Sequence, residues 1–310
     1  MKPVTGRLAP SPTGSQHIGN ARTYLAAWLS SRQQSGNIRL RIEDIDSPRT
    51  KPFAVQQALD DLQWLGLQWD GPPVVQTTRM ELYQNALDRL KARELVYPCT
   101  CTRKDIELAA SAPHAEHELP PYPGTCSHRN ASDAKKITNK PYAWRFRSSN
   151  SALSFYDDFA GQQNLNVAYG GDFVVWKNND TPAYQLAVVV DDAEMGITEV
   201  VRGDDLIPST PRQIQLYEAL GLPMPRFYHI PLVIGTDGHR LAKRHGDARI
   251  STFREQGLPT TTLLGLLAYS LGMQDRCEPI QLGSLLQTFQ IQAVPKSPFV
   301  MTDELLRNLN

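Results

Sequence analysis

The sequence lacks the features that mark several large classes of protein. It has no long apolar run: residues 1–12 contain no segment able to act as a signal peptide, and the richest later stretches, 186–190 and 263–271, are too short or too interrupted to span a bilayer. It has no excess of charge of either sign, because 32 Lys and Arg residues balance 32 Asp and Glu residues. We therefore expect a cytoplasmic protein with no membrane partner, and without the overall basic excess typical of nucleic-acid-binding proteins.

Cysteine is also scarce, and its distribution is uneven. Cys99, Cys101 and Cys126 lie close together, whereas Cys277 stands alone in a segment with a helical pattern and is predicted to be a core residue. A chain of this length needs no disulfide scaffold, and in a reducing compartment a cysteine cluster favours a metal. Three thiolates and one further donor satisfy the tetrahedral preference of zinc. The sequence predicts one zinc ion per chain; the alternative is three buried thiols without metal.

The N-terminal residues have the pattern of a βαβ unit. Residues 7–9 are predicted to form a short strand that enters the turn 10–15, and apolar residues recur at helical spacing from 18 to about 33. Gly36 is predicted to end this helix, and residues 38–42 alternate with the period of a strand. Because short βαβ units build parallel sheets, the predicted fold class is α/β.

The length of 310 residues suggests about two domains, and the remaining elements alternate with a change of character in the middle. Further helices are predicted over 52–70, 79–95 and 210–220, a strand over 228–234, and a mainly helical region beyond 253. The apolar run 184–190 is predicted to be a buried strand that ends at Asp191-Asp192. Between these parts, Cys, Pro and His crowd the sequence from residue 97, and strand-like pieces follow at 144–147 and 172–177. We expect this segment to be an insertion between two halves of the α/β domain.

The first motif that carries chemistry is His17-Ile-Gly-Asn20, at the start of the first helix. A helix N-terminus presents free N–H groups and a partial positive charge, which suit a phosphate. Gly19 lets a ligand approach the backbone, and His17 can donate hydrogen bonds to phosphoryl oxygens as charge builds there. The alternative, for the motif alone, is an ordinary helix start.

The second motif is the Gly-containing turn and cation cluster of residues 237–247. Such a segment is typical of a mobile loop that closes on a polyphosphate, with Lys243 neutralising the transferred charge. A solvated basic loop is the alternative for this motif alone.

Together and in this order, the two motifs resemble the signatures of the class I aminoacyl-tRNA synthetases, HIGH-like and KMSKS-like. The glutamyl branch is the closer match, in residues 7–23, 40–46, 189–192 and 201–206. The resemblance implies an α/β fold with a Rossmann-type parallel-sheet catalytic domain made of residues 1–96 and 181–250. It also implies a zinc-containing, acceptor-binding-like insertion at 97–180 and a short helical, stem-contact-like region at 251–310. The segment after Arg244 is too short for an anticodon-binding domain.

This combination resembles the truncated paralogues of the glutamyl branch, the glutamyl-Q tRNA(Asp) synthetases. The resemblance implies that ATP with Mg²⁺ converts L-glutamate to glutamyl-adenylate without tRNA, and that glutamate passes to the queuosine base of tRNA(Asp). No obligatory protein partner is implied. Two alternatives stay open: a truncated glutamyl-tRNA synthetase that charges a tRNA 3′ end, and a catalytically silent, zinc-containing tRNA-binding paralogue.

The resemblance also assigns a glutamate pocket that makes physical sense. Arg7 and Arg202 each grip a carboxylate, Glu43 and Ser11 hold the ammonium, and Tyr184 and the backbone of Ala9 complete the pocket. The family commonly has Asn four residues after this Tyr, where this chain has Val188. The residues expected to bind ATP are His17, Gly19, Asn20 and Lys243, and those expected to be catalytic are His17, Asn20 and Lys243.

The family further suggests that Tyr122 is the fourth ligand of the zinc held by Cys99, Cys101 and Cys126. A phenol must lose a proton to bind the metal, so the nearby histidines would be chemically easier ligands. These histidines are His114, His117 and His128.

Overall fold

The computed structural model describes residues 3–12, 16–45, 52–102, 104–106, 122–149, 153–165, 171–241, 248–307 and 309. At its centre are two groups of parallel strands. Strand β1 (Thr5–Leu8) pairs with β2 (Asn37–Ile42), and β2 pairs with β3 (Val74–Val75). Strand β9 (Glu199–Gly203) pairs with β10 (Arg226–Ile230). The two groups meet where the Thr198 N–H donates to the Thr5 carbonyl at 2.9 Å, so an α/β fold with parallel strands is confirmed.

Helix α1 (Ile18–Gln33) joins β1 to β2, as the periodicity predicted. It contacts β1 and β9 as well as the C-terminal helices α8 (Thr260–Ser270) and α9 (Leu282–Thr288), which explains why it is apolar on several sides. Gly36 follows this helix because a side chain would not fit there: a Cβ would lie 2.6 Å from the Val4 carbonyl oxygen. Its backbone is not in the left-handed conformation. The left-handed residue of this turn is Ser35, with φ of 54°.

The run 184–190 is a helix, not the predicted strand. It forms most of α5 (Tyr184–Glu194), which packs against α3 (Met80–Ala92), α6 (Thr210–Leu220) and β8 (Phe173–Trp176). Residues 186–192 are all buried, and a helix buried on all sides shows the same continuous apolar run as a buried strand. The three consecutive valines favoured the wrong choice.

Smaller corrections concern the ends of elements. Helix α2 (Pro52–Trp64) is shorter than the predicted 52–70, and α3 is preceded by a 3₁₀ turn, Gln76–Arg79. The strand predicted over 228–234 is two strands, β10 and β11 (Val233–Gly235), because Pro231 lies between them and has no N–H for a ladder.

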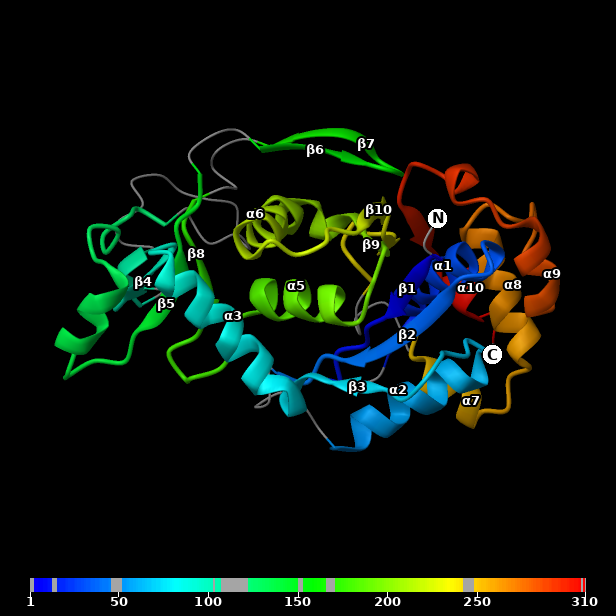
Figure 1. Ribbon diagram of the computed structural model, residues 1–310. Coiled ribbons are helices and arrows are strands. Elements are labelled where there is room, and N and C mark those ends of the chain that lie inside the picture. Colours follow the sequence, from blue (N-terminus) through cyan, green and yellow to red (C-terminus); the bar gives the residue numbers. More distant parts are fainter. Residues whose placement is uncertain are drawn as a thin grey trace.

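An antiparallel sheet occupies one end of the molecule and the C-terminal helices occupy the other (Figure 1). The sheet has the order β4 (Val96–Cys99), β5 (Ala143–Phe146), β8, and a hairpin of β6 (Leu153–Asp157) and β7 (Gly161–Leu165) extends beside β10. Its aromatic residues Trp144, Phe146 and Phe173 share one core cluster with α3, α5 and α6. This packing fixes the antiparallel sheet against helices α3, α5 and α6.

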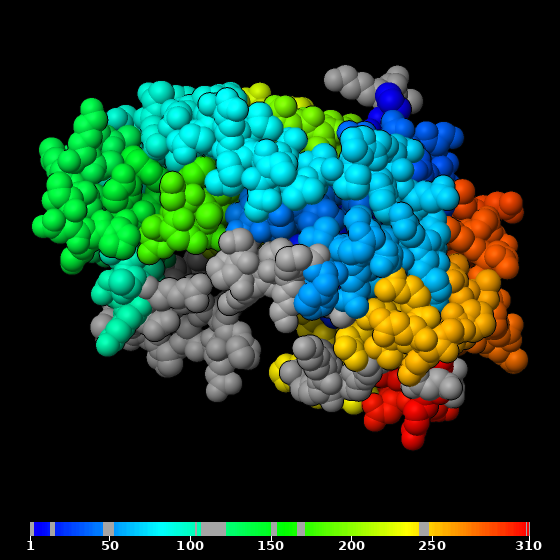
Figure 2. All heavy atoms as spheres, turned by 90° about the horizontal axis from the view of Figure 1, so that it is seen from below, coloured from blue at the N-terminus to red at the C-terminus, as the bar shows by residue number. Residues whose placement is uncertain are grey.

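The C-terminal segment is mainly helical, as predicted. It contains α7 (Ile250–Glu255), α8, α9, a 3₁₀ turn (Ile291–Ala293), β12 (Phe299–Met301) parallel to β11, and α10 (Asp303–Arg307). Helix α7 lies beside α2 (Figure 2). Arg254 on α7 pairs with Asp60 and with the buried Asp61 on α2. Among the described residues, no helix is both long and apolar enough to cross a membrane.

Candidate functional site

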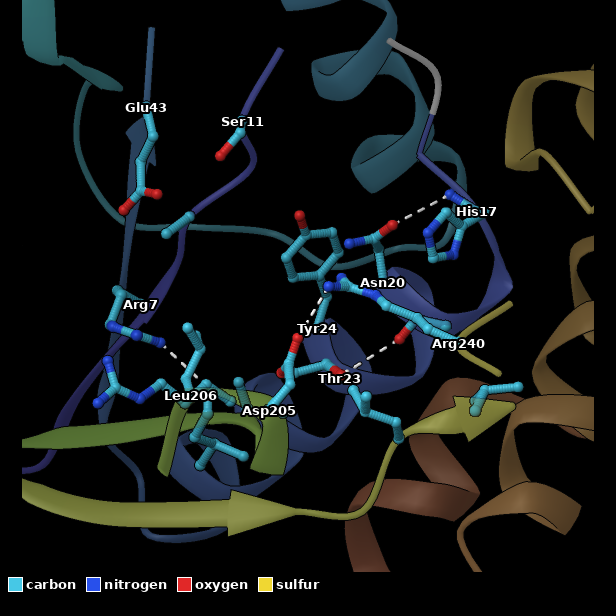
Figure 3. Close-up of a pocket in the computed structure, with 18 of the residues that line it drawn as sticks. Arg7, Ser11, His17, Asn20, Thr23, Tyr24, Glu43, Asp205, Leu206 and Arg240 are labelled. Carbon is cyan, nitrogen blue, oxygen red and sulfur yellow. Dashed lines mark hydrogen bonds and ion pairs between the residues drawn. The ribbon is translucent and has the colours of Figure 1, made fainter. Parts of the chain in front are cut away.

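One pocket opens at the carboxyl ends of β1, β2 and β9, with the N-terminus of α1 at its far side (Figure 3). It encloses about 280 Å³, at the edge of the sheet where ligands bind in α/β folds. Lys243 lies outside the described residues. Each of the other residues predicted to bind glutamate or ATP lines this pocket: Arg7, Ala9, Ser11, His17, Gly19, Asn20, Glu43, Tyr184 and Arg202.

Arg7, on β1, is a buried cation with spare hydrogen-bonding capacity. Its Nη1 donates to the Val201 carbonyl at 3.1 Å, and its Nε lies 3.8 Å from Asp192 Oδ1. That Nε is buried and has no hydrogen-bond partner among the residues that the structure describes. Burial lowers the pKa of Arg7, and the Asp192 carboxylate opposes that shift. A guanidinium in this state suits an anionic ligand, which would supply the missing acceptor.

Glu43 follows β2 as predicted, and it is fixed by a residue that the sequence did not single out. Arg41 is fully buried, and its Nε and Nη2 donate to Glu43 Oε1 at 3.2 and 3.0 Å. Its Nη1 donates to Asp192 Oδ1 at 2.5 Å. Asp192 therefore bridges Arg41 and Arg7, and together they position the Glu43 carboxylate at the pocket wall.

Arg202 lies near the end of β9, and it is held by neutral groups. Its Nη2 donates to Thr210 Oγ1 at 2.9 Å and to Gln213 Oε1 at 2.8 Å, and its Nε donates to His229 Nε2 at 2.9 Å. Only 4% of Arg202 is exposed. The pocket thus contains two buried arginines from opposite halves of the chain, one beside an anion and one among neutral partners.

His17 is the N-cap residue of α1, and its ring packs over Gly19. A Cβ on Gly19 would lie 3.2 Å from the ring atoms Cε1 and Nδ1, so a side chain there would displace the imidazole. Asn20 Oδ1 accepts the His17 backbone N–H at 3.4 Å. Burial, helped by the charge of Arg240, lowers the pKa of His17 to about 4. At neutral pH the ring is uncharged, and its buried Nδ1 has no partner among the described residues.

The segment that directly follows the second motif is hydrogen-bonded to the start of α1. Ile18 N donates to the Ala248 carbonyl at 3.0 Å, and Ile250 N donates to the Gln16 carbonyl at 2.9 Å. Before the undescribed residues 242–247, Arg240 lines the pocket and pairs with Asp205 at 2.8 Å. The chain on either side of Lys243 is therefore anchored next to the start of α1.

The remaining wall combines residues that the sequence did and did not predict. Tyr184 begins α5 and is 39% exposed, whereas Val188, one turn later, is 1% exposed, belongs to the core and does not line the pocket. Of the lining residues that were not assigned a role from the sequence, several lie within motif segments already recognised: Thr23, Val201, Gly203, Asp205, Leu206 and Arg240. The others belong to no such segment: Tyr24, Ala27, Leu232 and Val233.

The three clustered cysteines form a compact group at the end of β4. Their sulfur atoms all lie within 4.8 Å of one another, and Cys101 Sγ is 3.7 Å from Cys126 Sγ. Tyr122 Oη lies 3.3 Å from Cys99 Sγ and 3.8 Å from Cys101 Sγ. A zinc ion with Zn–S distances of ~2.3 Å needs donors separated by ~3.8 Å, and the separations of 3.7, 3.3 and 3.8 Å are close to that value. Cys277 is half-buried and packs against the core, as predicted.

The surroundings of the cysteines shift the pKa values of two of them in opposite directions. Arg145 Nε donates to the third, Cys99 Sγ, at 3.2 Å. Burial raises the pKa of Cys101 to about 11. Burial acts the same way on Cys126, but hydrogen bonds from the Thr100 backbone and from Tyr122 lower the pKa of Cys126 to about 7.

The described part of the chain favours Tyr122 over His128 as the fourth zinc ligand. No histidine there belongs to the cysteine group, and His128 is exposed. His114 and His117 lie outside the described residues. Tyr122 Oη is the donor that touches the cysteines, and it also accepts the Cys126 N–H at 2.8 Å.

Comparison with known proteins gives a consistent set of relatives. The family model for class I tRNA synthetases (E and Q), catalytic domain, matches residues 3–308. The glutamyl-Q tRNA(Asp) synthetase of Rhodopirellula baltica is 52% identical over 285 residues, which cover 88% of this chain and 86% of that protein. The glutamate–tRNA ligase of Geobacter sulfurreducens is 40% identical over 312 residues, covering 100% of this chain and 66% of that protein. The crystal structure of a glutamate tRNA ligase from Elizabethkingia meningosepticum, in complex with its amino acid, superposes with a TM-score of 0.84 at 26% identity. The superposition covers 100% of this chain and 69% of that one.

Proposed function

This chain belongs to the class I tRNA synthetases of the glutamate and glutamine type, which are ligases. We propose that its pocket activates L-glutamate with ATP in the absence of tRNA. We further propose that the activated glutamate is then transferred to queuosine in tRNA(Asp). The observation that carries the first half of this proposal is the pair of buried arginines, Arg7 and Arg202, with Glu43 in the same pocket. Glutamate has two carboxylates and one ammonium, so this set of charges is complementary to it.

The rest of the pocket suits adenylate formation. The glutamate α-carboxylate attacks the α-phosphorus of ATP, a P–O bond forms, and pyrophosphate leaves with the electron pair of the broken P–O bond. The nucleophile is already ionised, so no general base is required. The neutral His17, the N–H groups at the start of α1 and Lys243 stabilise the charge on phosphate, and Mg²⁺ shares it. Asn20 positions His17 through their hydrogen bond.

For the acceptor, the identity to the relatives supports queuosine. The chain is 52% identical to the Rhodopirellula glutamyl-Q tRNA(Asp) synthetase and 40% identical to the Geobacter glutamate–tRNA ligase. In the transfer step a hydroxyl of the queuosine ring attacks the mixed anhydride, and AMP leaves. We assign this reaction to residues 1–96 and 181–250, with RNA contacts from 97–180 and 251–310.

A zinc ion fits the cysteine group as a structural metal. Cys99, Cys101 and Cys126 would hold it with Tyr122 as the fourth donor, and the bound ion would crosslink β4 to the segment after residue 121. Arg145, which stacks over the Tyr122 ring at 3.9 Å and donates to Cys99 Sγ, would place a positive charge beside the thiolate ligands of the bound ion.

ATP–pyrophosphate exchange tests the activation half of the proposal. The purified chain is mixed with ATP, labelled pyrophosphate and L-glutamate without RNA, and L-aspartate and L-glutamine serve as controls. We expect exchange with glutamate alone. An absolute requirement for tRNA would favour an ordinary glutamyl-tRNA synthetase, and no exchange under any condition would favour a silent tRNA-binding paralogue.

A further inference from the structure

The buried side chain of His229 contacts Arg202 on the side away from the pocket. His229 is 1% exposed, and its Nδ1 is 2.5 Å from Asp157 Oδ2. Its Nε2 accepts the Arg202 Nε–H at 2.9 Å. Asp157 is fully buried at the end of β6, and its other oxygen, Oδ1, accepts the backbone N–H groups of Phe159, Ala160 and His229 at 2.9, 2.6 and 3.1 Å. The chain Asp157–His229–Arg202 therefore runs from the β6–β7 hairpin to the pocket.

The hydrogen bonds among Asp157, His229 and Arg202 favour one arrangement of protons on the His229 ring. Arg202 Nε always carries hydrogen, so His229 Nε2 accepts it and the ring proton lies on Nδ1, which faces Asp157. Thr210 Oγ1 lies 3.1 Å from the same Nε2, and its hydroxyl can rotate to donate to that nitrogen as well. Asp157 then has to be an ionised acceptor. Burial and the charge of Arg202 lower the pKa of His229, while hydrogen bonds from His229 and the backbone lower the pKa of Asp157 against the effect of burial. A neutral ring and a carboxylate are thus both favoured near neutral pH.

This arrangement leaves one face of Arg202 for a ligand. Both Nη2 hydrogens go to Thr210 and Gln213, and the Nε hydrogen goes to His229. Within the described part of the chain, Nη1 has no hydrogen bond, and Arg202 lines the pocket. Because the guanidinium is planar, fixing three hydrogens also fixes the direction of the other two.

We propose that Asp157 and His229 are positioning residues for the glutamate-binding Arg202: the carboxylate selects the Nδ1-protonated ring, and the ring aims the guanidinium at a substrate carboxylate. The inference rests on the proposed function, since it assigns Arg202 to glutamate. It also connects the pocket to the β6–β7 hairpin, whose strands do not themselves line the pocket.

The substitution Asp157→Asn tests the selection of the ring tautomer. Asn Oδ1 can still accept the three backbone N–H groups, but its amide N–H then faces His229 Nδ1. The ring proton must move to Nε2, where it opposes the Arg202 Nε–H. In ATP–pyrophosphate exchange, we expect KM for glutamate to rise about tenfold or more with KM for ATP unchanged. Asp158→Asn is the matched control, because the carboxylate of this neighbour pairs with the exposed Arg226 and lies outside the pocket wall, and it should leave both constants unchanged.

A second substitution separates positioning from a structural role of the hairpin. His229→Gln supplies a carbonyl oxygen to Arg202 whose position depends on no tautomer, so it should keep KM for glutamate within about threefold. His229→Leu removes the acceptor and should raise KM as Asp157→Asn does. In the His229→Gln background, Asp157→Asn should add less than about twofold, because no ring remains to be misprotonated. If Asp157→Asn raised KM equally in both backgrounds, Asp157 would act only through the hairpin fold and the proposal would be wrong.

The protonation state can be read without any substrate. In protein labelled with ¹⁵N histidine, His229 should give the signals of a neutral, Nδ1-protonated ring, and Asp157→Asn should convert them to the Nε2-protonated form. Wild-type signals of an Nε2-protonated or charged ring would overturn the proposal. The expected signals without glutamate-dependent exchange would instead contradict the assignment of the pocket to glutamate, so the two failures are distinguishable.

Discussion

The pocket and the cysteine group are built in opposite ways. The pocket collects residues from β1, α1, α5 and β9 and from the segment after β2, so positions 7 and 202 meet only when the whole α/β core is folded. The cysteine group collects Cys99, Cys101, Tyr122 and Cys126 from one short segment. A local group of thiols can be completed by a metal, whereas a pocket of buried charges depends on a network such as Asp192 with Arg41 and Arg7. Changes in the two regions should therefore affect adenylate formation very differently.

The largest effect is expected when a buried cation of the pocket is removed. Arg7→Ala would leave a glutamate carboxylate unpaired in a buried site, at a cost of ~2–4 kcal/mol by analogy with broken charged pairs. We expect glutamate-dependent exchange to fall by roughly 100-fold or more. Arg226→Ala is the control, because that side chain is on the surface and pairs with Asp158. Near-normal exchange in Arg7→Ala would place the glutamate site elsewhere.

A smaller effect is expected at the phosphate end of the pocket. The extra methyl group of Gly19→Ala would meet the His17 ring at 3.2 Å and push it away from the position it holds over the start of α1. Complete loss of one hydrogen-bond donor to the reacting group lowers kcat by ~10²-fold or more. A displaced His17 ring would keep part of its hydrogen bonding to phosphate. We therefore expect kcat for exchange to fall about tenfold. KM for glutamate should change little, and a large rise in KM with kcat unchanged would contradict this division of the pocket.

The cysteine group should matter much less for adenylate formation. Elemental analysis should find one zinc per chain, lost in Cys126→Ser and kept in the matched control Cys277→Ser. Because the pocket residues come from other elements, exchange should stay within about threefold of wild type, while transfer to RNA falls further. A fully active native protein purified without metal would exclude the structural zinc.

The smallest effect concerns the ionisation of His17 in the pocket, which should not change the exchange rate near neutral pH. The pKa of His17 is lowered to about 4, so its ring stays neutral down to that pH and exchange should show no His17 ionisation between pH 5 and 8. In the unfolded chain an ordinary histidine binds a proton near pH 6.5, so the free energy of unfolding falls as pH drops from 6.5 towards 4. His17→Asn should reduce that fall, as thermal unfolding at several pH values would show. An unchanged pH slope would mean that His17 is not buried as described.

The sequence predicted local features better than tertiary ones. Helix α1, strands β1 and β2 and the cysteine cluster follow from periodicity and spacing, which local physics controls. Helix α5 was missed because a run buried on all sides has no amphipathic period. The pocket residues were predicted from the family resemblance, since a lone Arg or Glu in sequence does not show what it faces.

The supporting residues were the hardest to foresee. Arg41 sits in an alternating strand pattern and looks like an exposed position, yet it is fully buried between Glu43 and Asp192. Asp157 and His229 belong to no motif, and they gain a role only because β6 and β10 pack side by side. Contacts between segments so distant in sequence depend on the complete fold.

The acceptor of glutamate tests the central claim most directly. The purified chain is incubated with ATP, labelled glutamate and, separately, queuosine-containing tRNA(Asp), the same tRNA(Asp) without queuosine, and tRNA(Glu). Nuclease digestion then locates the label in each RNA. We expect label only on the queuosine-containing tRNA(Asp), and within its anticodon fragment. Label on the 3′ end of tRNA(Glu), with none in the anticodon fragment of tRNA(Asp), would contradict the account.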